Sequence, residues 1–494
     1  MSGAFTKWKN NTTLDNLFHT IVKWYAAIIV IYQALWTLVP IRWAAACIGL
    51  HKLLPLLAPI GTLLILVDLL KDRIVFKSKY WFLLVASLGL MVISSLLYYR
   101  YGVSENLKVI IWQANQMLLL YSLYIRIGIA DFKRLFKLIF NIIPWALTAG
   151  VLVSLYQYVF TISYRCELGN TSFRQGLQEG RLFGVFTSVH YATVLILLTS
   201  IVLLYFLFKT QSRVAKTVYI LQIALFFIYI VLSGTRSVLV ALLCGDVVGS
   251  ILLVVRYVKS KNISLRFPKM FLYNASVAIA SVLCILVLYN GTKSMSVSFY
   301  QFIHQDSQIG TGDGNEENEE NDVPILDRED VNSGDVSNHR FQIWRDYFNC
   351  VSSQATSVIF GMTPGNYMKI IYEEFPDTYI VQYIVDNYPN MILEGRIYDT
   401  HNAYLNLYVS TGILGVLVIG LFIILSIKDA LVYLVRSPKI SSFFIMVSIC
   451  LIIIGVASFF DTDLFFKCSS ASLLFWLFCG LLQGEIGKSP CTAE

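Results

Sequence analysis

Charged side chains are scarce in this sequence. Asp, Glu, Lys and Arg make up 14% of the 494 residues, the apolar residue types make up 56%, and the mean hydropathy is +0.65. Soluble globular proteins carry about 25% charged residues, so this chain has too few to solvate even one soluble domain. The shortage excludes a cytosolic enzyme, a disordered protein and a typical nucleic-acid binder, despite a formal net charge of +7. It predicts a protein that crosses a membrane many times.

Common catalytic and redox motifs are also missing. The chain has no Walker loop, no HExxH, no CxxC and no GxSxG, which leaves ATPase, zinc-protease and serine-hydrolase functions without support. Most of the nine cysteines lie in apolar segments, where we expect them to act as small hydrophobic residues. Cys166 and Cys350 fall in predicted loops, and the sequence leaves open whether they pair.

Long apolar runs cover most of the chain. A transmembrane helix needs about 20 predominantly apolar residues. The sequence offers twelve such segments, at residues 24–39, 48–70, 80–99, 106–125, 138–160, 185–208, 218–232, 237–255, 270–290, 404–427, 441–460 and 464–482. We therefore predict an all-α polytopic membrane protein with about twelve transmembrane helices. Residues 1–290 would hold helices one to nine, and residues 404–494 helices ten to twelve with a short cytoplasmic tail.

The basic residues indicate how the chain is oriented. Loops on one side of the predicted spans carry 19 Lys and Arg residues, and the short loops on the other side carry 7. Because cytoplasmic loops are enriched in Lys and Arg, the first set and both termini are predicted to be cytoplasmic. The long loop at residues 291–403, between helices nine and ten, is then extracytoplasmic.

This long loop is acidic and divides into two parts. It holds 18 Asp and Glu residues against 6 Lys and Arg. Residues 306–335 lack apolar periodicity and are predicted to be a solvated, disordered insert. In the next segment, residues 339–348, Phe341, Trp344 and Phe348 recur at helical spacing, which predicts a helix with an apolar stripe on one face.

Ionisable side chains at the outer membrane face are candidate functional residues, because there they must be paired or used. Arg236 follows a tight outer turn, and Arg340 lies one helical turn before Trp344. His401 stands where the chain re-enters the membrane, and its helical spacing to Tyr404 predicts that it faces the helix bundle. For each residue alone a structural role, such as an arginine reaching to lipid headgroups, stays open.

One Asp-x-Asp occurs, at Asp461 and Asp463 in a predicted outer turn. Such a pair suits a divalent cation in sugar-phosphate chemistry. It also suits the N-terminus of the following helix, which favours negative charge. We expect the helix-capping role.

Five motifs follow one another along the chain. They are Thr235-Arg236-Ser237, Arg340-x-x-x-Trp344, Gly361-x-x-x-Gly365-Asn366-Tyr367, His401-Asn402-x-Tyr404-Leu405 and Thr411-Gly412-x-x-Gly415. This ordered combination, concentrated in about residues 180–427, resembles the bacterial O-antigen ligase/polymerase superfamily of membrane glycosyltransferases. Two features depart from the family pattern: Ser-Arg-Gly is common where this chain has Thr-Arg-Ser, and the acidic insert is not shared.

The resemblance implies inverting transfer of a glycan from a polyprenyl-diphosphate lipid, without a metal or other cofactor. The reaction would take place on the outer face of the bacterial cytoplasmic (inner) membrane. His401 would be the essential histidine, and Arg236 and Arg340 the essential arginines. Arg181 falls where family members often carry an arginine near the lipid diphosphate. The remaining candidate substrate-binding residues, from the same motifs, are Trp344, Asn402 and Tyr404.

These residue types suit the implied chemistry. A diphosphate leaving group gains negative charge as the glycosidic bond breaks, and arginine forks stay protonated and meet two phosphate oxygens at once. An acceptor hydroxyl must lose its proton as it attacks, and a neutral imidazole can take it. Arginine and histidine together could therefore serve such a reaction.

Three functions stay open at this point. We predict a polymerase of O-antigen or capsule repeat units, since weak similarity outside the motifs is typical of the more diverse polymerases. An O-antigen ligase, which transfers the finished glycan to a lipid or protein, is the first alternative, and a polysaccharide or lipid transporter or flippase is the second. The expected partners are the polyprenyl-diphosphate-linked oligosaccharide, the lipid bilayer, a chain-length regulator and a flippase of the same pathway, and no nucleic acid.

Overall fold

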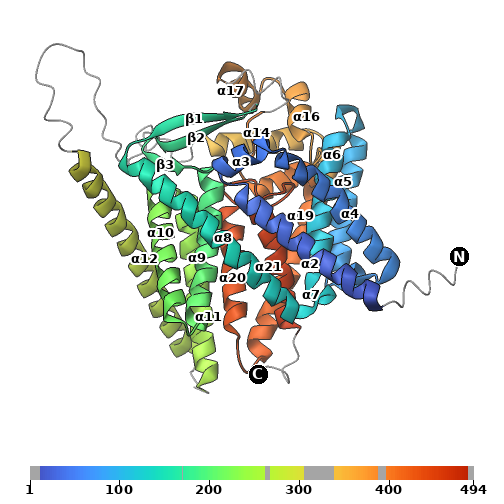
Figure 1. The fold of residues 1–494 in the computed structure, drawn as a ribbon. Helices are drawn as coiled ribbons and strands as arrows, with labels where there is room; N and C mark the ends of the chain where they lie inside the picture. The colour runs from blue at the N-terminus through green and yellow to red at the C-terminus, as the bar shows by residue number, and fades with distance from the viewer. Residues whose placement is uncertain (1–11, 170, 262–266, 305–338, 388–396, 488–494) are drawn as a thin grey trace, which may run out of the picture. The chain divides into compact units, whose positions relative to one another are not determined.

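The computed structural model describes residues 12–169, 171–261, 267–304, 339–387 and 397–487, and helices dominate them (Figure 1). In chain order the α-helices are α2 (Thr12–Leu35), α3 (Val39–Cys47), α4 (Leu53–Lys71), α5 (Trp81–Leu97), α6 (Ser104–Ala114), α7 (Leu123–Arg126), α8 (Gly128–Val159), α9 (Val189–Lys209), α10 (Arg213–Leu232), α11 (Arg236–Ser260), α12 (Phe267–His304), α14 (Arg340–Ser352), α15 (Ala355–Phe360), α16 (Tyr367–Glu374), α17 (Tyr379–Asn387), α19 (Ala403–Arg436), α20 (Ser442–Ala457) and α21 (Ser470–Ile486). The predicted disordered insert, 306–335, lies outside the described residues.

The predicted class, a helical polytopic membrane protein, is confirmed. Eight helices in the described ranges are long and apolar enough to cross a membrane, namely α2, α4, α8, α9, α10, α11, α12 and α19. Three shorter apolar helices, α5, α20 and α21, match further predicted spans. Some helices outrun the predicted segments, since α12 continues to His304 and α19 to Arg436. The number of spans stays a prediction.

The predicted span at 106–125 is not one regular helix. It consists of α6, a π-helix labelled η4 (Asn115–Leu120) and the short α7. Its polar side chains Gln113, Asn115 and Gln116 are all buried. The wider turn of a π-helix changes the direction in which successive side chains point. Apolar composition therefore located this segment but did not reveal the change in helical geometry.

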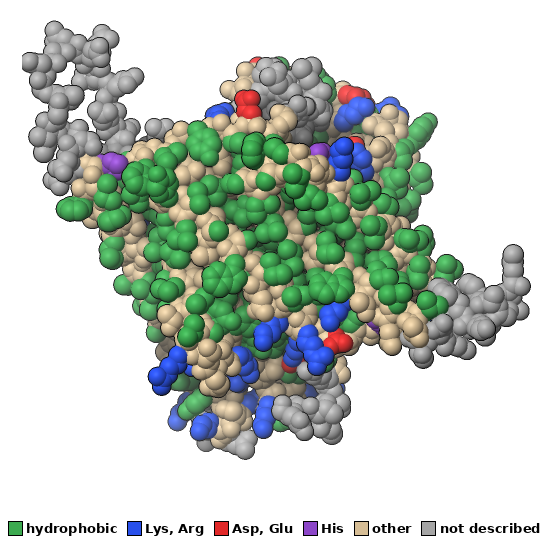
Figure 2. Space-filling model, viewed as in Figure 1, with side chains coloured by type: hydrophobic (Ala, Val, Ile, Leu, Met, Phe, Trp, Pro, Cys, Tyr) green, Lys and Arg blue, Asp and Glu red, His purple; other side chains and the backbone are tan. Residues whose placement is uncertain are grey.

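Large hydrophobic side chains remain exposed along the long helices. Trp24, Leu63, Trp145 and Val435 are each more than half exposed, and hydrophobic side chains cover a large part of the visible surface of the described chain (Figure 2). Exposed apolar area on this scale is far beyond that of a monomeric soluble protein. It is the surface expected of helices that face lipid.

The described chain forms two compact units. Unit 1 comprises residues 1–33, 51–139 and 339–494, and unit 2 comprises residues 34–50 and 140–338. Arg340 and His401 belong to unit 1, whereas Arg181 and Arg236 belong to unit 2. The candidate residues therefore fall into two separate groups.

Unit 2 contains a small antiparallel sheet that the sequence analysis did not predict. Strands β1 (Ser163–Leu168), β2 (Thr171–Gln178) and β3 (Arg181–Gly184) pair in the order β1-β2-β3. The β2–β3 turn places both Glu179 and Gly180 at positive φ, as a tight two-residue hairpin requires. The sheet thus fixes where Arg181 leaves the turn.

In unit 1 the short helices after residue 339 have their own core. α14 turns Ile343, Tyr347 and Val351 toward buried residues of α16 and α17. The predicted aromatic stripe is present on α14, but only Trp344 of it packs against this core, because Phe341 is 69% exposed and Phe348 is 54% exposed. A second stripe at the same helical spacing, which begins at Ile343, faces the core instead.

Two motif glycines join α15 to α19. Gly412 breaks α19 with φ 63° and ψ −167°, and a Cβ at this position would lie 2.5 Å from the Gly361 nitrogen. Gly361 itself has φ +75°, and its Cβ would lie 2.5 Å from the Ser410 carbonyl oxygen. The next residue, Met362, donates its backbone N–H to the Val409 carbonyl at 2.7 Å. The two glycine motifs therefore form one backbone-to-backbone crossing.

We expect Gly412→Ala to destabilise the protein. The strained backbone alone should cost about 1–3 kcal/mol, and the clash with α15 should add to this. A lower thermal unfolding midpoint in detergent would show the effect. Gly420→Ala is the matched control, because a Cβ at Gly420 of the same helix meets nothing within 4 Å; equal losses in both variants would contradict the proposed crossing.

Candidate functional site

His401 lies in the turn before α19 rather than on the helix. Asn402 has an extended backbone, and its side-chain oxygen accepts the N–H groups of Tyr404 at 2.9 Å and Leu405 at 3.0 Å. The helix therefore begins at Ala403, because Asn402 acts as its N-cap. The prediction that helical spacing to Tyr404 turns His401 into the bundle was wrong.

The backbone at His401 is strained and its imidazole is available. His401 has φ 45°, a left-handed conformation that is uncommon for residues other than glycine. Its ring stands edge-on to Tyr398 with centroids 5.5 Å apart. Within the described ranges, neither ring nitrogen has a hydrogen-bond partner. A half-buried, uncommitted imidazole can exchange a proton with a bound hydroxyl.

Neighbouring helices hold the backbone on the N-terminal side of His401, where the segment 398–402 passes α14. The Trp344 indole N–H donates to the Thr400 carbonyl at 2.9 Å, and the Tyr347 hydroxyl donates to the Tyr398 carbonyl. On the other side, the Ala403 N–H donates to the Ser458 carbonyl at 2.9 Å. Such contacts are what a strained backbone needs in order to persist.

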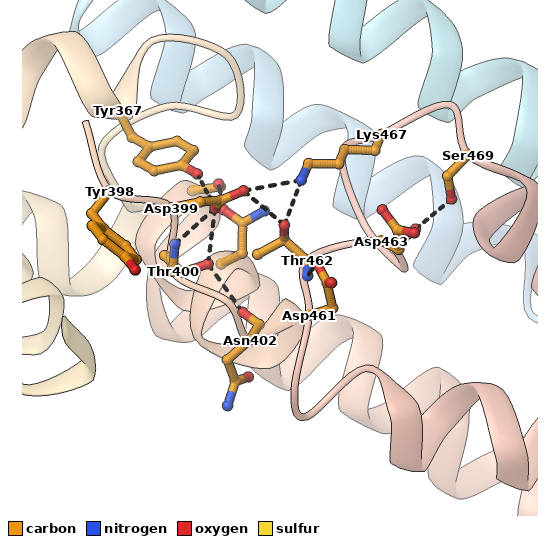
Figure 3. Close-up of polar contacts among 12 residues, drawn as sticks. Tyr367, Tyr398, Asp399, Thr400, Asn402, Asp461, Thr462, Asp463, Lys467 and Ser469 are labelled. Carbon is orange, nitrogen blue, oxygen red and sulfur yellow. Dashed lines mark hydrogen bonds and ion pairs between the residues drawn. The ribbon is translucent and has the colours of Figure 1, made fainter. Parts of the chain in front are cut away.

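Asp399 lies at the centre of a polar cluster two residues before His401 (Figure 3). Its Oδ1 accepts hydrogen bonds from the Tyr367 hydroxyl at 3.1 Å and from the Thr400 N–H at 2.7 Å. Its Oδ2 accepts from Thr462 Oγ1 at 2.9 Å and from Lys467 Nζ at 3.0 Å. The carboxylate thus joins segment 398–402 to α16 and to the turn between α20 and α21.

The charges in this cluster stabilise one another. Burial would raise the pKa of Asp399, but the charges of Lys467 and His401 hold that pKa below its usual range. Burial would likewise lower the pKa of Lys467, but the charge of Asp399 raises it above the usual value. Burial and the Asp399 charge both raise the pKa of Tyr367. At neutral pH the cluster therefore contains a carboxylate, an ammonium group and a phenol that donates.

Arg340 and Tyr404 both lie against the C-terminal end of α20. The Arg340 guanidinium carbon stands 5.9 Å from the centroid of Phe460, and the Tyr404 ring stands 4.4 Å from that of Phe459. The Tyr404 hydroxyl donates to the Gly455 carbonyl at 2.7 Å.

Unit 1 therefore brings the predicted residues Arg340, Trp344, His401, Asn402 and Tyr404 together. In this structure the side-chain contacts of Trp344, Asn402 and Tyr404 serve packing and capping.

Unit 2 brings the other two predicted residues, Arg181 and Arg236, to one turn. Arg181 Nε donates to the Ser233 carbonyl at 3.1 Å, and Arg236 is the first residue of α11. Arg236 is exposed, and its guanidinium makes no hydrogen bond or ion pair with the described residues. Because helix N-termini favour anions, this turn suits a negatively charged group.

Side chains around this turn hold α9 and α11 together. Ser237 Oγ lies 3.0 Å from His190 Nδ1, and Thr193 Oγ1 donates to Thr235 Oγ1 at 3.4 Å. Thr235 and Ser237, which flank Arg236, therefore have a structural role, because both contact α9.

The Asp461 and Asp463 carboxylates do not cap α21. Ser469 does so, with its Oγ accepting the Ser472 N–H at 3.1 Å. Asp461 Oδ1 instead accepts the N–H of Thr462 at 2.7 Å. The expected capping role was wrong, because α21 begins at Ser470, well beyond the acidic pair.

A family model described as O-Antigen ligase matches residues 221–420. This match supports the predicted O-antigen ligase/polymerase superfamily. It supports a membrane enzyme of the O-antigen pathway and suggests a glycosyltransferase-like activity. A comparison with curated proteins gave no match.

The O-antigen ligase match begins within α10 and ends within α19. It contains Arg236, Arg340 and His401 together with the motif glycines, and Arg181 lies outside it. The matched family implies a polyprenyl-linked glycan as substrate and a lipid membrane as surroundings. The roles of the individual residues in this family member stay predictions.

The sequence analysis missed the cluster of Asp399, Thr462 and Lys467. One signal was present: Lys467 is the only charged residue in the predicted span at 464–482, and a charge inside a predicted membrane helix indicates a functional or paired residue. In the structure α21 begins only at Ser470, so Lys467 lies in the turn where it meets Asp399.

Proposed function

We propose that this protein is a polymerase of polyprenyl-diphosphate-linked oligosaccharide repeat units, which builds an O-antigen or capsule polysaccharide at the outer face of the bacterial cytoplasmic membrane. The observation that carries the proposal is His401, an uncommitted imidazole in a strained turn that α14 and α20 hold in place. The proposed reaction needs a general base and positively charged groups that bind the diphosphate. His401 and the arginines of this chain can supply both.

The proposed step is an inverting displacement. The acceptor hydroxyl oxygen bonds to the anomeric carbon while the bond from that carbon to the diphosphate oxygen breaks. His401 takes the hydroxyl proton, and the polyprenyl diphosphate leaves with the bonding electrons. Arg340, Arg236 and Arg181 are assigned to the diphosphate, because protonated guanidinium groups stabilise its growing charge without a metal.

A direct test uses purified protein in detergent with a polyprenyl-diphosphate-linked repeat unit as both donor and acceptor. We expect a ladder of extended glycans and released polyprenyl diphosphate, with equal rates with and without EDTA. Because no membrane remains to be crossed, a transporter would form no glycosidic bond. Transfer only to a finished lipid or protein acceptor would identify a ligase instead. A requirement for Mg²⁺ or Mn²⁺ that depends on Asp461 would overturn the proposed mechanism.

A further inference from the structure

A row of aromatic rings leads from His401 along α17. The His401 ring contacts Tyr398, with centroids 5.5 Å apart, and Tyr398 contacts Tyr383 at 5.2 Å. Tyr383 contacts Tyr379 at 5.5 Å, and Tyr379 contacts His339 at 5.9 Å. Five rings from three segments of unit 1 therefore form one continuous row, which begins at the proposed base.

The sequence of α17 places two of these rings on one side of the helix. Tyr379 and Tyr383 are four residues apart, so their side chains are neighbours on the helix surface. Ile380 and Val381 are almost fully buried in the core of the helices after residue 339, whereas the two tyrosines are half-buried. The row therefore runs along the edge of this core and not through it.

Hydrogen bonds fix Tyr398, which joins the row on α17 to His401. The Tyr398 N–H donates to the Ile380 carbonyl of α17 at 3.4 Å. Its own carbonyl accepts the hydroxyl of Tyr347 on α14. Because Tyr398 is held from two helices, the row is preformed, and a ligand would not have to order it on binding.

Half-buried rings in such a row suit a glycan. The C–H faces of a sugar ring are apolar and pack against aromatic rings, and phenol and imidazole groups can hydrogen-bond sugar hydroxyls. Neighbouring centroids in the row are 5.2–5.9 Å apart, which is close to the length that one sugar residue adds to a glycan chain. The three central side chains are phenols, which suit sugar rings better than a diphosphate.

We propose that the aromatic row of Tyr398, Tyr383, Tyr379 and His339 is the binding site for the acceptor oligosaccharide. The sugar with the reacting hydroxyl lies at His401, and the sugars next to it pack along α17. This inference rests on the proposed function, because it names where the substrate of the base binds. The tyrosines of the row bind the glycan and take no part in proton transfer.

The test is equilibrium binding of a free oligosaccharide to the full-length protein in detergent. The probe is the repeat-unit oligosaccharide that mild acid releases from the lipid-linked donor of the same bacterium, and calorimetry measures its Kd. Tyr383→Leu and Tyr379→Leu keep an apolar side chain against the core but remove the ring. We expect Kd to rise about 3- to 10-fold in each variant, as for the loss of one aromatic contact, and further in the double variant.

Kinetics with the same oligosaccharide as acceptor provide a second readout. In the Leu variants the KM for the acceptor should rise by the same factor as Kd, and kcat should stay near the wild-type value, because the base is intact. Tyr383→Trp keeps a ring and should bind like the wild type. Tyr372→Leu is the matched control, since Tyr372 is an exposed tyrosine of α16 outside the row; it should leave Kd and KM unchanged.

A third measurement needs no substitution. Bound oligosaccharide should protect Tyr379 and Tyr383 of the wild-type protein from nitration by tetranitromethane, whereas Tyr372 should react equally with and without it. Mass spectrometry of the peptides would show this. If the Leu variants do not fold, protection alone decides, and unprotected tyrosines would count against the row.

The other outcomes are distinct. Absence of binding by the wild-type protein, or a wild-type Kd in the Leu variants, overturns the inference. Variants that instead lose binding of a polyprenyl phosphate without sugars also overturn it, because the rings would then hold the lipid tail. Glycan binding that depends on the row, in a protein that never extends a glycan, supports the inference and overturns the proposed polymerase.

Discussion

His401→Ala should stop polymer formation in cells while the protein remains in the membrane. Loss of general base catalysis costs about 10²–10⁴ in rate, whereas alanine keeps the Cβ that causes the backbone strain at φ 45°, so the protein should still fold. The unused lipid-linked repeat unit should accumulate. Quantifying this lipid by mass spectrometry, together with membrane levels of the protein, checks the prediction.

The control for this variant is His304→Ala. His304 ends α12, where its ring nitrogen contacts the Val159 carbonyl at 3.1 Å and Thr161 Oγ1 at 3.3 Å. Its loss should affect local packing and leave polymer formation near normal. Normal polymer in His401→Ala, with no accumulated lipid, would show that the histidine is not the base.

Replacing either predicted catalytic arginine by lysine should reduce kcat/KM sharply. Lysine keeps the positive charge of Arg236 or Arg340 but loses the fork that meets two phosphate oxygens at once. We expect a fall of about 10- to 100-fold in each single variant. The measurement is glycan extension by purified enzyme at several donor concentrations.

Each arginine has a nearby control. Arg345→Lys tests α14, where Arg345 is exposed, and Arg174→Lys tests unit 2, where Arg174 pairs with Glu179 at 2.7 Å. Both should remain active. Full activity of Arg236→Lys or Arg340→Lys would leave only a general electrostatic or structural role for that arginine.

Composition predicted the fold class because a bilayer forces long apolar helices, and such runs are visible in one dimension. The small sheet was missed although its turns left a signal. Gly169-Asn170 and Glu179-Gly180 each separate two short β-compatible segments by two residues, as in hairpins. The π-helix at Asn115–Leu120 left no comparable signal, because it arises from packing of buried polar side chains.

The candidate site was predictable only residue by residue. Arginine and histidine at the outer face suggested their chemistry, but the conformation of His401 depends on contacts from α14 and α20. The Asp399–Lys467 pair joins residues 68 positions apart. The pattern of residues within one segment cannot reveal a partner that only the tertiary fold brings close. The same pattern also predicted that Lys467 lies inside a membrane helix, whereas α21 begins at Ser470.

The break at Gly412 has a consequence for how the enzyme adapts to its membrane. Gly412 divides the 34 residues of α19, and the 24 residues that follow it would extend about 36 Å, beyond a hydrocarbon core of about 30 Å. A helix of this length meets bilayers of different thickness by tilting. Because α15 holds the first turns at the Gly361–Gly412 crossing, the part below Gly412 can tilt while Ala403–Thr411 stays fixed. The turn that holds His401 would then keep its geometry in thin and thick bilayers alike.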